Sequence, residues 1–316
     1  MMGPSLLAGI DTEESRSKQV GVTVAICTFR RPSVTKAVKS VARQKLPPNI
    51  AMRILVIDND ATPSAKDLIE DLHATSPVKI EYMHVPGQNI SVARNAALGA
   101  ATTRMLAFLD DDEYAAPDWL ANLFALSEGA QAVFGPCEAT YPDDAPSWMK
   151  AGDYHSNRIR RSRRAIDTGY TSNVLIDMEF VRLNGLKFDP ALGQTGGEDT
   201  MFFHAFHKSG GTLRYAPQAI VHEEVVSSRL NLTWIRLRRY RAGQVYAMML
   251  YRFSRRSYRR AVCTAPVKIF ACLFMYGLLI FSPARALWWL MRGFFHLGVL
   301  SFGLGAEVHR EYRRNA

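Results

Sequence analysis

The chain has 316 residues, of which 48% are hydrophobic and 22% charged, a composition that fits a globular protein and excludes a disordered one. Its four cysteines are scattered without a CxxC pair, so nothing favours a disulfide framework or a zinc site, and a reducing compartment is expected. The net charge of +10 is uneven: from residue 225 onward sixteen Lys and Arg face only Glu307 and Glu311, which gives +14 and leaves −4 for residues 1–224. A mildly acidic body therefore precedes a basic tail suited to an anionic surface.

The first twenty residues carry three acidic side chains and only a short apolar patch at 6–10, a pattern that does not favour a secretory signal. We expect a mobile leader over residues 1–20, a catalytic domain over 21–228, and a helical, membrane-associating tail over 229–316.

Short β-branched runs alternate with helical patterns through the first third of the chain. Strands are predicted at 22–27, 52–57, 78–84 and 104–109, and helices at 34–44, 64–74 and 90–101. This order is typical of an α/β fold with a mostly parallel central sheet, whose ligands bind beyond the carboxyl ends of the strands. The polar residues that follow each strand are therefore the first candidates for a site.

Residues 142–164 are rich in Pro, Asp, Ser and Arg without periodicity, which predicts a long loop. Its cluster of arginines either steers an anionic substrate or forms a solvated charged loop: Arg158, Arg160, Arg161, Arg163 and Arg164. Trp148 in the same loop could stack on a sugar ring or belong to the core. Beyond the loop we expect a strand at 171–176, a helix at 198–208, and an extended segment at 213–222 that Pro217 interrupts.

Three consecutive carboxylates, Asp110, Asp111 and Asp112, end the fourth predicted strand. They repel one another unless a cation or hydrogen-bond donors are present, and Mg²⁺ or Mn²⁺ prefers such oxygen ligands. Acidic residues before the predicted helix at 117–126 are the alternative, because they are also favoured at a helix N-terminus.

Five segments occur in an order that resembles family 2 glycosyltransferases with the GT-A fold, in particular bacterial exopolysaccharide enzymes of the succinoglycan type that elongate a lipid-linked repeat unit. These segments are AICTFRR at 25–31, VIDND at 56–60, 89–95, FLDDD at 108–112 and GGED at 196–199. The resemblance covers roughly residues 20–225 and depends on the order of the motifs more than on any one of them.

The resemblance implies an inverting enzyme that transfers a sugar from a nucleotide-sugar, expected to be a UDP-sugar, to a hydroxyl group. Thr28 and Asp58 would contact the nucleoside, with Asp58 at the base, and Asp110 and Asp112 would form a DxD motif that meets a divalent metal and the diphosphate. The full set implied to bind the nucleotide-sugar is Thr28, Arg31, Asp58, Asp60, Asn89, Arg94, Asp110 and Asp111.

Two of these residues have ordinary structural alternatives. Asp58 could instead cap the helix that follows its strand. Arg94 could pair with phosphate through its planar guanidinium, or lie on the solvated face of the predicted helix at 90–101.

The paired glycines Gly196 and Gly197 permit a tight turn that places two carboxylates at a helix start. The resemblance implies that Asp199 is the base that deprotonates the acceptor hydroxyl, and Glu198 would hold the acceptor or orient the loop. The alternative is a Gly-Gly turn capped by acidic residues.

His222 follows an apolar strand where some GT-A enzymes place a third metal ligand, beside Asp112 and Asp110. Imidazole tolerates Mn²⁺. A packed or hydrogen-bonded histidine is the alternative.

In the tail, apolar and aromatic residues recur at helical spacing beside ten arginines between 229 and 260, a basic amphipathic pattern that attracts anionic lipid. Apolar runs follow at 269–281 and 286–306. Pro266, Lys268, Pro283 and Arg285 enclose the first run and shorten it below the length of a membrane span, so in-plane or re-entrant insertion is predicted at the cytoplasmic face of the inner membrane. A two-helix membrane hairpin, and a soluble helical hairpin that covers the catalytic domain, remain alternatives.

The expected partners are a nucleotide-sugar donor, a lipid-linked saccharide acceptor and an anionic membrane surface, but no nucleic acid. A nucleotidyltransferase is disfavoured because no Gly-rich phosphate loop follows the first strand. A noncatalytic, membrane-tethered nucleotide-sugar-binding protein of the same fold is disfavoured because Glu198 and Asp199 are present.

Overall fold

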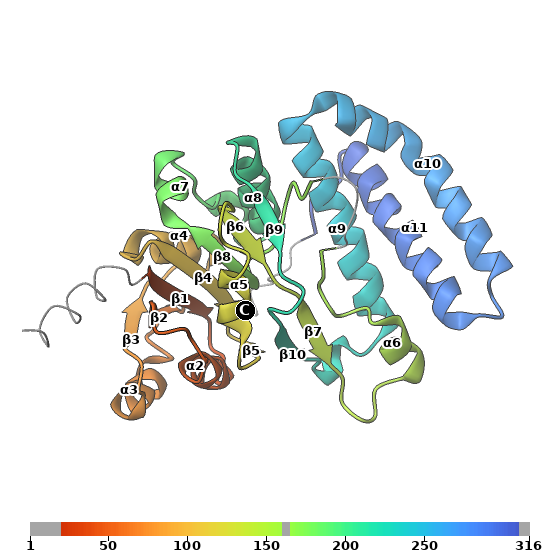
Figure 1. The fold of residues 1–316 in the computed structure, drawn as a ribbon. Coiled ribbons are helices and arrows are strands. Elements are labelled where there is room, and N and C mark those ends of the chain that lie inside the picture. Colours follow the sequence, from red (N-terminus) through yellow and green to blue (C-terminus); the bar gives the residue numbers. More distant parts are fainter. Residues whose placement is uncertain (1–19, 160–164, 310–316) are drawn as a thin grey trace, which may run out of the picture.

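The computed structural model describes residues 20–159 and 165–309. Its main sheet has the strand order β3-β2-β1-β4-β8-β6-β9 (Figure 1). The bounds are β1 Val20–Thr28, β2 Ile50–Asp58, β3 Ile80–His84, β4 Met105–Asp110, β6 Ala132–Phe134, β8 Asn173–Asp177 and β9 Leu213–Tyr215. The predicted leader lies almost wholly outside the described residues, as do Arg160, Arg161, Arg163 and Arg164.

Strands β3, β2, β1 and β4 are parallel, as their near-continuous apolar sequences predict. Strand β8 runs antiparallel to both β4 and β6. The predicted α/β fold with a mostly parallel sheet is therefore confirmed, with one reversed strand that periodicity alone does not reveal.

Helices cover both faces of the sheet, which explains why its strands carry apolar side chains on both sides. One face packs against α2 Val34–Ala42, α3 Lys66–Thr75 and α5 Trp119–Phe124. The other face packs against α4 Ile90–Ala100, α7 Met178–Leu183 and α8 Glu198–Lys208. The result is a three-layer body with two hydrophobic cores (Figure 1).

A second, smaller sheet has the order β5-β10-β7 and joins Glu113–Ala115, Val221–Glu224 and Cys137–Thr140. Its central strand β10 pairs antiparallel with β5 and parallel with β7. This sheet brings residues just after the DxD segment beside residues about a hundred positions later in the chain. The two short 3₁₀ helices are η1 Pro190–Leu192 and η2 Ser227–Arg229.

The predicted long loop at 142–164 is wrong in its first part, which contains α6 Ser147–Gly152. This helix packs on the tail through Met149, whose cluster includes Ile235 and Met291. A six-residue helix without regular periodicity is specified by that packing more than by its own sequence. Trp148 belongs to the same cluster, in favour of the core alternative.

The tail forms three helices, α9 Leu232–Phe253, α10 Arg255–Leu278 and α11 Pro283–Gly303, on one side of the body (Figure 1). The expectation that Pro266 shortens the apolar run is wrong, because α10 continues through this residue. Of the described helices, α10 alone has a length and apolar composition compatible with a membrane crossing, and 11% of its most apolar stretch is buried. Its opposite face packs on α11 through Ala265 and Cys272, among others.

Candidate active site

A pocket of about 170 Å³ opens at the carboxyl edge of β1 and β4. Strand register explains its position, because Thr28 pairs with Asp58 and Cys27 with Asp110 at the same edge of the sheet. Of the residues predicted to bind the nucleotide-sugar, those that line the pocket are Thr28, Arg31, Asn89, Arg94, Asp110 and Asp111. The tertiary fold thus brings together side chains from three separate motifs.

Asp111 is buried and accepts hydrogen bonds from the Thr28 hydroxyl at 2.8 Å and from Arg31 Nη1 at 2.9 Å. These bonds join the end of β1 to the DxD segment. Burial raises the pKa of Asp111, and Arg31 opposes the rise. Asp111 therefore fixes the DxD segment against Thr28 and Arg31, which line the pocket with it.

The two outer carboxylates of the DxD segment contact arginines from different parts of the chain. Asp112 Oδ2 lies 2.6 Å from Arg31 Nη1 and 3.7 Å from Arg229 Nη2. Asp110 Oδ1 lies 3.5 Å from Arg94 Nη2. Each carboxylate thus has a cation beside it that a bound metal ion would replace or reinforce.

Arg94 is buried, so the alternative of a solvated helix face is wrong. Its guanidinium contacts Asp110 and forms an ion pair with Glu198, and these carboxylates raise its pKa against the opposing effect of burial. Since Asp199 also lies close enough to raise this pKa, Arg94 links the DxD segment to the start of α8.

Helix α8 begins after a turn that requires glycine. Gly196 and Gly197 have φ of 81° and 92°, and a Cβ on Gly197 would lie 2.7 Å from Val245. The turn directs Glu198, which is buried, toward Arg94. Asp199 is partly exposed, and its carboxylate accepts the backbone N–H of Thr200 at 2.6 Å.

Asp58 and Asp60 lie behind the pocket wall. The two oxygens of Asp58 accept bonds from the backbone N–H groups of Asp60 and Ala65 and from the Tyr82 hydroxyl, and the side chain is fully buried. These bonds hold the turn that precedes α3. The helix-cap alternative is wrong, because α3 begins after Ala65 without a side-chain cap. Asp60 forms an ion pair with Arg30, whose φ of 55° marks a constrained turn after β1.

Six pocket residues were not among those predicted to bind the nucleotide-sugar: Cys27, Phe29, Asn59, Gln88, Ile90 and Gly193. Asn59 bridges two loops, because it donates to Val85 O at 2.8 Å and accepts from Asn89 N at 2.5 Å. Asn89 in turn caps α4, and a Cβ on Gly193 would lie 1.8 Å from its Oδ1. The position of Asn59 between two candidate aspartates was the signal that could have identified it.

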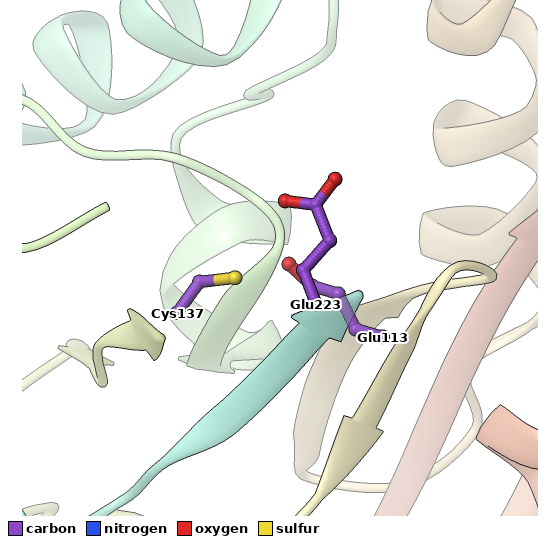
Figure 2. A group of neighbouring side chains, drawn as sticks. All are labelled: Glu113, Cys137 and Glu223. Carbon is purple, nitrogen blue, oxygen red and sulfur yellow. The ribbon is translucent and has the colours of Figure 1, made fainter. Parts of the chain in front are cut away.

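His222 stacks on Tyr114, with ring centroids 5.2 Å apart. Because side chains alternate along a strand, its neighbour Glu223 points to the other face of the small sheet, toward Glu113 and Cys137. Figure 2 shows these three side chains together, with their ligand atoms within 4.8 Å of one another. Burial raises the pKa of both Glu113 and the Cys137 thiol, and Glu113 Oε2 accepts Asp110 N at 3.3 Å. Through the hydrogen bond of Glu113 to the Asp110 backbone, this cluster contacts the DxD segment.

A divalent metal fits the DxD carboxylates better than it fits the cluster of Glu113, Cys137 and Glu223. Burial, followed by the neighbouring Asp112 and Asp111, raises the pKa of Asp110 to about 7 despite Arg94, so a cation at this point would relieve an unfavourable charge. Asp110 and Asp112 offer the oxygen ligands that Mg²⁺ and Mn²⁺ prefer, whereas a protonated thiol does not. When bound, such a metal would neutralise charge on a diphosphate.

The sequence is similar to known proteins along most of its length. It is 40% identical to the succinoglycan biosynthesis protein ExoM of Rhizobium meliloti (strain 1021), over 92% of this chain and 95% of that protein. It is 24% identical to the glucosyl-dolichyl phosphate glucuronosyltransferase of Haloferax volcanii, over 70% of this chain and 75% of that protein.

Solved structures share the fold at low sequence identity. The S. aureus TarS 1-349 complex with UDP has a TM-score of 0.50 at 13% identity and matches 93% of this chain and 95% of that one. GalNAc-T7 with UDP, GalNAc and Mn²⁺ has a TM-score of 0.58 at 15% identity, over 79% of this chain and about half, 51%, of that one. The fold is therefore GT-A. Residues 23–183 match the model of the glycosyl transferase family 2, and together with the ExoM similarity this shows that the chain belongs to that family.

Proposed function

We propose that this glycosyltransferase transfers a sugar from a UDP-sugar, with inversion, to a hydroxyl of a lipid-linked glycan in exopolysaccharide biosynthesis. The single observation that carries the proposal is the continuity of the pocket with the start of α8, since Arg94 contacts both Asp110 and Glu198. The donor side and a pair of acidic residues are thereby held in one site. The similarity to ExoM, a succinoglycan biosynthesis protein, supports the exopolysaccharide pathway, and the UDP complexes of the structural neighbours support the donor.

In this proposal Thr28, Arg31 and Asn89 bind the donor, and Asp110 and Asp112 hold Mg²⁺ or Mn²⁺. Asp58 and Asp60 would shape the nucleoside side of the pocket, supported by the hydrogen bonds and the ion pair that hold their loop. His222 stays a prediction as a third ligand, and its ring stacks on Tyr114.

Asp199 is proposed as the base. It takes the proton of the acceptor hydroxyl while the acceptor oxygen attacks the anomeric carbon from the side opposite the diphosphate, which inverts the configuration. Its partly exposed position at the start of α8 suits an acceptor that enters from solvent. Glu198, ion-paired with Arg94, orients the segment that carries it.

The catalytic part spans residues 21–228, and residues 229–316 attach it to the cytoplasmic face of the inner membrane. Support comes from the exposed surface of α10, where basic residues occupy the first half and apolar residues the second. The apolar part continues into the turn after α10 and comprises side chains that are 51–98% exposed: Val267, Phe270, Leu273, Phe274 and Leu278 of the helix, and Ile280 and Phe281 of the turn. Arg255, Arg256, Arg259 and Arg260 are exposed at the other end. Because the two kinds of side chain separate along the helix axis, the turn between α10 and α11 would enter the bilayer while the arginines meet the head groups.

The test of the proposed base is Asp199→Asn, assayed with a panel of UDP-sugars and a lipid-linked acceptor in the presence of Mn²⁺. We expect transfer to fall by about 10³-fold, within the range for loss of a general base, while the Kd for UDP stays within about twofold. The matched control is Asp118→Asn, because this exposed carboxylate makes no cap hydrogen bond. Transfer at the wild-type rate in the Asp199 variant would exclude the base assignment, and absence of transfer by the wild type with every donor would exclude the function.

A further inference from the structure

We propose that Arg229, at the junction of the catalytic body and the tail, binds the diphosphate of the donor and neutralises the charge that develops on the leaving nucleoside diphosphate. This inference rests on the proposed function and adds a residue to it. Arg229 lies beyond both the sheet and the family motifs, at the end of η2 and three residues before α9.

The first observation is the position of Arg229 beside the DxD segment. Its Nη2 lies 3.7 Å from Asp112 Oδ2, the same oxygen that Arg31 Nη1 contacts at 2.6 Å. Asp112 is also a proposed metal ligand, so its carboxylate would be shared between these arginines and a cation. Arg31 and Arg229 would then be available to the diphosphate, whose negative oxygens such guanidinium groups prefer.

The second observation is that Arg229 is already fixed in place without a ligand. Its guanidinium forms an ion pair with Glu223 and lies 5.6 Å from the centre of the Trp234 ring. Trp234 is itself held, since its backbone N–H donates to the capping side chain of Asn231 at 2.8 Å. A cation held in this way needs little reorganisation when charge develops near it.

The backbone of Arg229 is fixed as well. Its carbonyl lies 3.1 Å from His155 Nε2, and the His155 ring stacks on Trp234 at 4.9 Å with an interplanar angle of 10°. The Tyr141 hydroxyl lies 3.1 Å from His155 Nδ1 and donates to it, which leaves Nε2 to donate to the carbonyl. Buried His155 thus ties the loop after β7, η2 and α9 together.

The chemistry needs a cation at this point. As the acceptor oxygen bonds to the anomeric carbon, the bond from that carbon to the diphosphate oxygen breaks and its electron pair stays on the diphosphate. The acceptor proton goes to Asp199. Arg229 would bind the diphosphate oxygens beside Asp112, which directly follows the pocket-lining Asp110 and Asp111. The segment that attaches the protein to the membrane would therefore also complete its active site.

The test compares UDP with UMP, which lacks the β-phosphate, in the presence of Mn²⁺. For Arg229→Gln we expect the Kd of UDP to rise about tenfold and that of UMP to stay within about twofold, as loss of one charge-assisted contact predicts. The kcat for transfer should fall by about 100-fold, in the range of a lost transition-state donor. Arg229→Lys, which keeps the charge and loses the fork, should recover part of both.

Two variants separate this role from a structural one. Arg229→Gln combined with Glu223→Gln removes both partners of the ion pair and avoids a lone buried charge, so it should fold and show the same selective loss for UDP. Arg236→Gln, also on α9 but beside Phe294, should leave the UDP to UMP ratio unchanged. Equal losses for UDP and UMP, or no loss, would overturn the proposal. A wild-type protein that binds neither nucleotide would instead refute the proposed function.

Discussion

The α/β body and the helical tail differ in which side chains they bury and which they expose. The body buries charged side chains, among them Asp58, Arg94 and Glu198, and offsets each with a partner from another element: Tyr82 for Asp58, and the Arg94–Glu198 ion pair for the other two. The tail exposes apolar side chains such as Phe270 and Phe281 to solvent. Burial of unpaired charge is unfavourable, and the body avoids it through these partners. Exposure of large apolar side chains is also unfavourable in water, and in the tail it favours a further contact surface. The body suits a charged ligand, and the tail suits a lipid surface.

The comparison predicts the largest effect on stability where a buried charge loses its partner. Arg94→Met leaves Glu198 and Asp110 without their shared cation inside the site. We expect the free energy of unfolding to fall by about 3–5 kcal/mol, the range for breaking a buried ion pair. Urea unfolding followed by circular dichroism measures this change.

The matched control is Arg104→Met, because Arg104 is 66% exposed and lies 3.5 Å from Asp177. A surface pair of this kind contributes less than about 1 kcal/mol. Equal losses of unfolding free energy in the two variants would contradict the inference that the buried Arg94 pairs stabilise the body more than a surface ion pair does.

The tail should show its largest effect on membrane binding and almost none on folding. Replacement of Phe270, Phe274 and Phe281 by Ser removes side chains that are 63–98% exposed. Since insertion of each ring into lipid contributes about 1.5 kcal/mol or more, we expect partition into anionic vesicles to fall by at least about 100-fold. Co-sedimentation measures the partition, and a thermal scan checks the fold.

Leu68 and Leu183, which are 37% and 79% exposed on the body, provide the control. Their replacement by Ser should leave vesicle binding unchanged. If both sets of variants bind vesicles as the wild type does, the exposed face of α10 has another partner.

The smallest effect is expected at the junction of the two regions, where His155 is buried. Burial, with Arg238 and Arg229 nearby, lowers its pKa to about 4, against the opposing effects of the Arg229 carbonyl and Asp153. Because the folded pKa lies below the unfolded value, the neutral ring contributes stability above about pH 6.5 that is lost as the pH falls toward 4. At pH 5 we expect a loss on the order of 1 kcal/mol, after allowance for solvent screening.

His155→Phe keeps a ring against Trp234 but cannot titrate. The difference in melting temperature between wild type and variant, measured from pH 7 to pH 4.5, should therefore shrink or reverse at the acidic end. A difference that is independent of pH would show that His155 does not couple the junction to protonation. Tyr141, with its hydroxyl on His155 Nδ1, remains neutral over this range.

The sequence by itself determined the elements whose signals are local. Apolar runs identified β1, β2 and β4, the Gly-Gly turn identified the start of α8, and the charge asymmetry identified the tail. Motif order was enough to anticipate that Thr28, Arg31, Arg94 and Asp110 share one pocket, because parallel strands end at a common edge.

Only the tertiary structure decided what depends on contacts between distant segments. The reversed direction of β8, the continuation of α10 through Pro266 and the packing of α6 on the tail have no local signature. The surroundings of each charged side chain also have no local signature. Asp58 is buried in hydrogen bonds, Arg94 is buried, and Arg229 contacts Asp112 although 117 positions separate them in the chain. The energy of a charge depends on burial and on neighbours in space, and spacing along the chain specifies neither.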